Sequence, residues 1–421
     1  LSQEATRESM ENGAFYAVSR VSRVDEINHI NKNTQEAQPG SGNESTLYLL
    51  DQETPVIKEI KVDDKEDTIE ITGDNFDEIE WIADGEVIAE GEKINLNDHK
   101  DKINSYVRAQ LKSDTGIAYT QPFGLTSHEE ELNPEDSEAP EDKPEINEEK
   151  VTEEEKITKI DYEIHNPYEK VEWGKWDQYK ANFHTHSTNS DGGNLTREMV
   201  EDHYKKGYDI LAMTDHNYVT RGWENADKGP VTIERKREIE SGVDRDGKGM
   251  LDFSYSNEQS KTDHINTFGL DWNNGDKPTM DSTLAKADEM NAIAHINHMG
   301  RYTGYKNGSQ VSSNPEEILK YVNLLRDHDN TVGVEIVNKI DNESRYDRIL
   351  WDNILMNLMP EGRNVWGFSN DDTHSLNATG YSFNMMLMPE LSQEATRESM
   401  ENGAFYAVSR VSRVCLLYTS D

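Results

Sequence analysis

The chain has 421 residues, with 83 Asp plus Glu against 43 Lys plus Arg and a formal net charge of -40. This length allows two or three domains that each bury a core. Such an acidic surface should repel phosphate backbones, which argues against a general nucleic-acid binder. Cys415 is the only cysteine, which excludes a disulfide framework and a cysteine-based zinc site. No apolar run approaches the roughly 18 residues that a membrane span needs.

Residues 1–24 recur without a single change as residues 391–414. Each copy predicts a helix that a glycine ends and a short strand follows. We interpret residues 1–24 as an orphan copy of the segment that closes the second domain, and expect it to compete for the same groove or to fray. Residues 415–421 break the pattern and look like a non-native tail.

Residues 25–54 are polar and predict a linker, after which short β-runs begin at Pro55. These runs are separated by turn signals, and Asp84-Gly85 is the strongest hairpin signal among them. Their spacing predicts a separate, small, Ig-like β-sandwich over residues 55–126. Residues 127–156 are rich in Glu and Asp and poor in apolar side chains, so they predict an acidic disordered linker.

Between residues 157 and 414 apolar β-runs alternate with helical patterns, which predicts an α/β fold with a barrel or an open sheet of mostly parallel strands. The clearest strands lie at 208–214, 291–296, 331–337 and 364–369. In such folds the chemistry gathers where the strands end at their carboxyl side. The functional side chains are therefore expected at these ends.

Side chains that can bind metal follow successive strand ends. His184 and His186 lie two residues apart, so on a strand they share one face, and Asp191 follows on the next turn. Later strand ends supply further candidates, namely His216, Glu258, His264, His295, His298, Glu335, Asp372 and His374. A single His-x-His pair is as often a surface feature as a metal site, but a series at strand ends is hard to obtain by chance. Imidazole and carboxylate together suit zinc, manganese or iron, and a bridging carboxylate lets two ions sit about 3.5–4 Å apart.

These residues carry a resemblance to a known family. The segments His184-Thr-His186, Ser190-Asp-Gly192, Thr214-Asp-His216, Glu258, His298-Met-Gly-Arg301 and Asp372-Thr-His374 resemble, in order, the motifs of the PHP (polymerase and histidinol phosphatase) family. The resemblance covers about residues 178–412. It implies a distorted (β/α)7 barrel over 157–414, up to three metal ions and hydrolysis of a phosphoester.

The resemblance also implies which residues hold which ion. His184, His186 and Asp372 would hold one ion, and Glu258 would bridge it to a second ion that His298 completes. Asp191, His216 and His374 would hold a third ion. The proline that usually follows the fourth-segment histidine is Met299 here.

Two ligand assignments stay open. His295 competes with His298, which we prefer because a Gly-Arg pair follows it. His328, Glu335 and Asn338 compete for the fifth-segment ligand, and we prefer Glu335 because it lies at a strand end.

Water bound to a divalent ion has a pKa lowered towards 7, which supplies hydroxide for in-line attack on phosphorus. Arg301 is the candidate to clamp a phosphate oxygen through its planar guanidinium, although a surface ion pair explains it equally well. His264 would contact the substrate or support a ligand, and a buried core histidine is the alternative.

We therefore predict a hydrolase with two to three divalent ions (zinc, manganese or iron) and a small phosphorylated substrate. The alternatives are a nuclease that acts on nucleotide ends and a surface interaction protein whose metal cluster is structural. The sandwich and the acidic spacer favour an enzyme exported by a bacterium over a cytoplasmic one.

Overall fold

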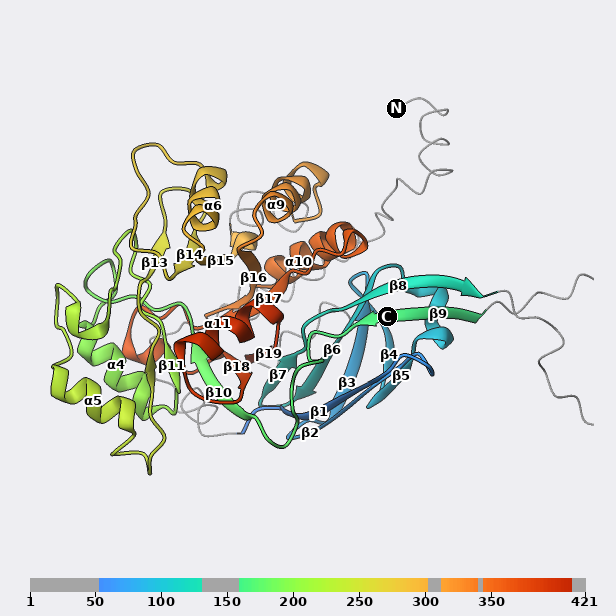
Figure 1. The fold of residues 1–421 in the computed structure, drawn as a ribbon, viewed down its shortest axis with the longest axis horizontal. Coiled ribbons are helices and arrows are strands. Elements are labelled where there is room, and N and C mark those ends of the chain that lie inside the picture. The colour runs from blue at the N-terminus through green and yellow to red at the C-terminus, as the bar shows by residue number, and fades with distance from the viewer. Residues whose placement is uncertain (1–52, 131–158, 302–311, 340–343, 411–421) are drawn as a thin grey trace, which may run out of the picture.

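A computed structural model describes residues 53–130, 159–301, 312–339 and 344–410. Figure 1 shows a β-rich part on the right and an α/β part on the left. The first repeat copy, with its expected competition for a groove, and the tail lie outside the described residues. Most of the polar linker and of the acidic linker lies outside them as well.

The β-rich part consists of two antiparallel sheets that share an apolar core. Their strands are β1 (Val56–Asp63), β2 (Thr68–Asp74) and β5 (Lys93–Asn95) in one sheet, and β3 (Glu78–Ala83), β4 (Glu86–Glu90), β6 (Tyr106–Ser113) and β7 (Gly116–Tyr119) in the other. The predicted hairpin between β3 and β4 is confirmed, because Asp84 and Gly85 take the positive φ angles of 49° and 73° that a type I′ turn requires. The Ig-like character of this part stays a prediction.

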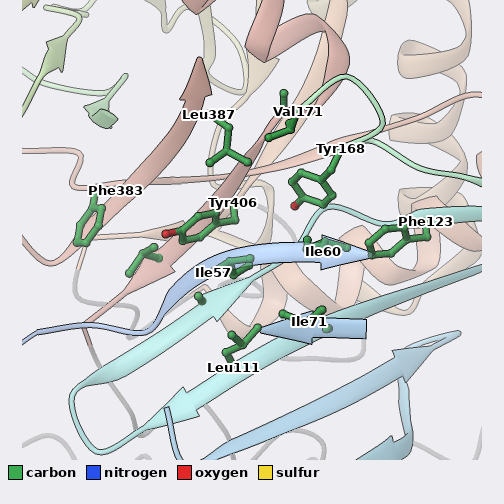
Figure 2. Close-up of a cluster of buried hydrophobic side chains, with 14 of the residues drawn as sticks. Ile57, Ile60, Ile71, Leu111, Phe123, Tyr168, Val171, Phe383, Leu387 and Tyr406 are labelled. Atoms are coloured by element: carbon green, nitrogen blue, oxygen red, sulfur yellow. The ribbon is translucent and has the colours of Figure 1, made fainter. Parts of the chain in front are cut away.

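The β-rich part is not a separate module, because its strand β7 continues the sheet of the α/β part. β7 pairs with β19 (Phe405–Ser409) in antiparallel register, with Tyr119 opposite Ala407, within an eleven-stranded sheet. This pairing satisfies backbone groups that an edge strand would expose. Figure 2 shows the shared core, in which Ile57 and Leu111 of the β-rich part belong to the same cluster as Tyr406.

Strand pairing also extends into the segment that we expected to be a linker. β8 (Phe123–Glu130) pairs antiparallel with β9 (Lys159–His165) from Gly124 to Glu130. Residues 127–130 are therefore part of a strand, because cross-strand pairing compensates for their polar composition.

The α/β part contains two sheets of mixed direction rather than mostly parallel strands. One sheet contains β10 (Asp177–Asn182), β11 (Ile210–Leu211), β12 (Leu251–Asp252), β18 (Ser382–Met388) and β19; the other contains β13 (Ser256–Gln259), β14 (Ile265–Phe268), β15 (Ile293–Ile296), β16 (Thr331–Asn338) and β17 (Trp366–Asn370). β15, β16 and β17 are parallel, whereas β13, β14 and β15 are antiparallel. Residues 260–264, which join β13 to β14, are too short for the crossover that parallel strands need.

Isolated bridges link these two sheets at one end. Thr185, just after β10, bridges to Thr373, just after β17, and His216, after β11, bridges to Glu258 on β13. The backbone N–H of His186 also donates to the carbonyl of Thr373 at 2.8 Å. Strand ends from both sheets therefore meet at the end where the predicted ligands lie.

Helices cover the outer faces of these sheets (Figure 1). They are α4 (Thr196–Lys205), α5 (Ile233–Ser241), α6 (Met280–Glu289), α9 (Pro315–Asp327), α10 (Arg345–Leu358) and α11 (Gln393–Asn402), with short 3₁₀ turns η1 (Leu96–Lys102), η2 (Trp223–Asn225), η3 (Met359–Glu361) and η4 (Leu376–Ala378). α9 shows how local residues begin a helix. Asn314 caps it by accepting from the N–H of Glu316, and Pro315 occupies the first turn. Its buried residues Ile318, Val322 and Leu325 recur at helical spacing and face the core.

The second repeat copy forms the predicted helix and strand. Ser392 caps α11 by accepting from the N–H of Ala395, and Gly403 ends the helix at a φ of 73°. A Cβ at Gly403 would lie 2.8 Å from the Trp366 ring, so this position is restricted by space as well as by backbone conformation. β19 then lies between β18 and β7, with all five of its residues buried.

Within the described residues, no helix is both long and apolar enough to cross a membrane. Export by a bacterium stays a prediction.

Candidate metal centre

The centre of the site is Glu258 on β13, a fully buried carboxylate that five histidines surround. Its oxygens lie 3.3 Å from His184 Nε2, 3.4 Å from His186 Nε2 and 3.4 Å from His298 Nε2. They lie 2.8 Å from Nδ1 of both His216 and His264. One carboxylate with two oxygens is therefore in position to connect more than one metal ion.

The pKa of Glu258 favours the ionised carboxylate, which is the form that binds metal. Burial alone would raise its pKa, but positive charge on His184 and the close approach of the other histidines, with a hydrogen bond to His264, hold the pKa well below the usual range. The amide of Asn297 also donates to Glu258 Oε1 at 2.8 Å. The carboxylate is therefore kept ionised and correctly oriented.

One group of candidate ligands comprises His184, His186 and Asp372, all buried. Asp372 Oδ1 lies 3.4 Å from His184 Nε2 and 3.2 Å from His186 Nε2. Burial acts to raise the pKa of Asp372, but positive charge on His184 and His186 and on nearby Lys339 holds it well below its usual value. Asp372 has a φ of 44°, a backbone conformation that is costly for a residue with a side chain.

These atoms fit a divalent ion. Nε2 of His184, Nε2 of His186 and Oδ1 of Asp372 are buried and face one another, yet none of them makes a hydrogen bond within the described part of the chain. Buried polar atoms are normally paired, because leaving them unpaired costs about 1–3 kcal/mol each. Convergent nitrogen and oxygen donors of this kind are the ligands that zinc, manganese or iron accept.

Glu335 on β16 lies in a second group with His184 and His298. Its Oε1 is 2.8 Å from His184 Nδ1 and accepts from the amide of Asn370, while Oε2 accepts from the amide of Asn338. In the neutral imidazole that binds a metal, a proton held on His184 Nδ1 would leave the lone pair on Nε2, the atom that faces Glu258 and Asp372. This geometry is typical of a carboxylate that orients a metal-binding histidine, so an orienting role suits Glu335 better than direct ligation, which stays a prediction.

The structure separates the histidines that the sequence left as alternatives. His298, just beyond β15, has a φ of 27° and lies in the cluster. His295, on β15 itself, stacks on the ring of Phe368 at 4.8 Å between centroids and contacts Phe268 at 5.4 Å. Burial lowers the pKa of both His295 and His298 to about 4, so the ring contacts distinguish the two histidines and the pKa does not.

The remaining alternatives for the fifth-segment ligand lie outside the cluster of donor atoms. His328 pairs with Asp288 and Asp281, with its Nδ1 2.7 Å from Asp288. Asn338 donates to Glu335 and therefore supports that carboxylate.

A third group, His186, Asp191, His216 and His374, forms the solvent side of the site. Asp191 Oδ1 lies 3.4 Å from His374 Nε2, and its Oδ2 lies 3.6 Å from His216 Nε2. The Asp191 side chain is 56% exposed, whereas His184 and Glu258 are fully buried. An ion held here would therefore be the most accessible to solvent.

Asp215, inside the Thr-Asp-His motif, is a buried residue whose role the sequence did not reveal. Its carboxylate accepts from the backbone N–H groups of Ser187 and Ser190 and from both of their hydroxyls. These bonds fix the turn that presents Asp191. In the sequence, Asp215 could be noticed because it directly precedes His216. That position does not distinguish a supporting residue from a metal ligand.

The two residues predicted to act in catalysis both reach the site. Arg301 Nη2 lies 2.9 Å from Asn338 Oδ1 and 3.5 Å from Asp372 Oδ2, and its side chain is 28% exposed. His264 Nδ1 lies 2.8 Å from Glu258, within a group that could itself hold a metal with His216. His264 is thus a candidate ligand, although the resemblance had assigned it to no ion.

Comparisons with known proteins give structural neighbours only. No family model matches the chain, and no curated protein matches it. It is similar to a two-domain protein from Bacteroides vulgatus that contains a predicted PHP-like metal-dependent phosphoesterase, with 18% identity and a TM-score of 0.39. The match covers 56% of this chain and 65% of that protein, which is less than two thirds of its length.

Two further solved structures are similar over about half of the chain. A protein from Bifidobacterium adolescentis, provisionally described as a metal-dependent phosphoesterase, has 14% identity and a TM-score of 0.33, with 53% of this chain and 96% of that one covered. An amidohydrolase from Chromobacterium violaceum has 14% identity and a TM-score of 0.31, with 55% and 99% covered. The chain is thus similar to one solved structure described as containing a PHP-like metal-dependent phosphoesterase and to another described as a metal-dependent phosphoesterase.

Proposed function

We propose that this chain is a metal-dependent phosphoesterase of the PHP type that acts on a small phosphorylated substrate. The observation that carries the proposal is the position of Glu258, whose two oxygens connect histidines of all the candidate ligand groups. A structural metal site is usually closed by its ligands. Here Asp191, His216 and His374 are partly exposed, which leaves a side open to substrate.

The residues suggest an assignment of ions. His184, His186, Asp372 and Glu258 would hold one ion, Glu258 with His298 and His264 would hold a second, and Asp191, His216 and His374 would hold a third. When bound, such ions lower the pKa of water and neutralise charge on a phosphoryl group. The chain's own contribution is to fix the ligands: Glu335 holds His184, Asn297 holds Glu258 and Asp215 holds the Asp191 turn.

We further propose that the strands around this site form the distorted seven-stranded barrel that the resemblance implies. Ladders connect β10 to β11 and join β13 through β17 in order. The bridges from Thr185 to Thr373 and from His216 to Glu258 would complete the ring at the ligand end.

Arg301 is the residue that we propose to bind a phosphate oxygen. It lies beside the ligand Asp372 and remains partly exposed, and its planar guanidinium can donate two parallel hydrogen bonds. Hydrolysis would then form a bond from a water oxygen to phosphorus and break the ester P–O bond, while the proton of the water passes to the leaving oxygen.

The proposal is tested on the full chain by elemental analysis of bound metal together with hydrolysis of an aryl phosphate. His186→Ala should lose at least one ion and at least about 100-fold in activity, because His186 belongs to two ligand groups. His165→Ala is the matched control, since His165 is exposed on β9 and should leave both readouts unchanged. Absence of stoichiometric metal in the wild type, or metal without hydrolysis of a broad ester panel, would favour an interaction protein with a structural metal cluster.

A further inference from the structure

Lys339, which the sequence did not single out, lies directly beside the candidate metal centre. Its ammonium is 3.3 Å from Asp372 Oδ2, and its side chain is 42% exposed. It follows the last residue of β16, so its backbone is placed by the same strand that carries Glu335. An exposed lysine is therefore directed at a carboxylate that is itself only 2% exposed.

The backbone of Lys339 is held in an unfavourable conformation. Its φ is 56°, in the left-handed region that a residue with a long side chain rarely adopts. Two contacts secure it: its N–H donates to the carbonyl of Asn370 at 3.0 Å, and its carbonyl accepts from the hydroxyl of Ser382. Backbone strain of this kind persists where the surrounding structure holds a residue in place. Here the surrounding structure holds Lys339, and with it a positive charge, beside Asp372.

Asp372 divides its two oxygens between different neighbours. Oδ1 faces His184 and His186, whereas Oδ2 faces both Lys339 and Arg301. The two cations come from separate elements, one after β16 and the other in the helical turn that follows His298. One carboxylate charge thus stands beside two positive side chains, and that carboxylate is also a candidate metal ligand.

We propose that Lys339 and Arg301 together bind a dianionic phosphoryl group, so that the substrate is a phosphomonoester rather than a diester. A monoester phosphate has a second pKa near 6 and carries about two negative charges at pH 7, whereas a diester carries one. Lys339 and Arg301 carry two positive charges, which equal in number the two negative charges of the dianion. This inference rests on the proposed function, of which it names the substrate class.

Lys339 is accordingly a substrate-binding residue, and its test compares three variants of the metal-loaded full chain. Lys339→Gln removes the charge, Lys339→Arg keeps it, and Lys286→Gln is a control on α6, where the lysine pairs with the exposed Glu289 instead of a candidate ligand. The measurements are bound metal, the affinity for inorganic phosphate, and kcat/KM for an aryl phosphate monoester and for the matching bis-aryl diester.

Lys339→Gln should weaken phosphate binding about tenfold and lower kcat/KM for the monoester about 10- to 100-fold, as expected for loss of a charge-assisted contact. For Lys339→Gln, kcat/KM for the diester should change less than about threefold, and the metal content should stay constant. Lys339→Arg should recover most of the loss in kcat/KM for the monoester. Equal losses on both esters, unchanged phosphate affinity, or loss of metal would overturn the inference. If the wild type hydrolyses neither ester yet binds phosphate through Lys339, the proposed function fails while the phosphate site stands.

Discussion

The ion pair between Arg108 on β6 and Asp352 on α10 connects the β-rich part to the α/β part. Both side chains are fully buried, and two guanidinium nitrogens lie 3.0 Å from the two carboxylate oxygens. Tyr106 donates to the same carboxylate at 2.8 Å, and the guanidinium lies 5.1 Å from the centre of the Trp351 ring. Replacing Asp352 by leucine preserves the branched shape but removes the charge.

Asp352→Leu should be strongly destabilising. The buried guanidinium loses its carboxylate, and breaking a buried pair in this way costs about 3–5 kcal/mol. For a protein of this size about 2 °C of Tm corresponds to 1 kcal/mol, so the expected loss is about 6–10 °C. The double variant Arg108→Met with Asp352→Leu should recover most of this loss, because it removes both charges together and leaves an apolar contact on Trp351.

Urea denaturation followed by circular dichroism, with the same samples in a thermal scan, measures both quantities. Arg221→Met is the comparison, because Arg221 pairs with Asp271 at the surface, with both side chains about half exposed, and should cost less than about 1 kcal/mol. If Asp352→Leu lowers the unfolding free energy by no more than Arg221→Met does, the pair of Arg108 and Asp352 is not desolvated. A double variant as unstable as the single one would show that the charges are not compensating each other.

Three further predictions concern the site and its surroundings. Glu258→Gln should lower the metal content by at least one ion per chain in elemental analysis, because the central carboxylate loses its charge and one acceptor oxygen. His295→Leu should retain the wild-type metal content, whereas His298→Leu should reduce it, because only His298 lies among the ligand atoms. Burial raises the pKa of Asp252 to about 6, so its stabilising contribution is complete below pH 3.8 and lost as pH rises through 6. The unfolding free energy of the wild type minus that of Asp252→Asn, measured in chelator, should therefore fall by at most about 3 kcal/mol over that window, and a flat difference would refute the assignment.

Much of the local structure followed from the sequence, because its causes lie within a few residues. Asp84-Gly85 produces the hairpin through the φ angles of its own two residues, and Ser392 and Gly403 bound α11 through a cap and a left-handed turn. The candidate metal centre could also be predicted from the sequence, because His184 and His186 share a face at a strand end and the other candidates recur at later strand ends. Which residues can bind metal is a property of side-chain chemistry and order along the chain.

The tertiary structure decided what depends on contacts between distant segments. Pairing of β7 with β19 joins residues nearly 290 positions apart, and no local pattern in either strand specifies its partner. The choice of His298 over His295 depends on the path of the chain beyond β15, which turns one imidazole into the cluster and leaves the other among aromatic rings. The approach of Lys339 to Asp372 likewise depends on how β16 and β17 end side by side, since only folding brings a cation and a carboxylate from separate loops to one point.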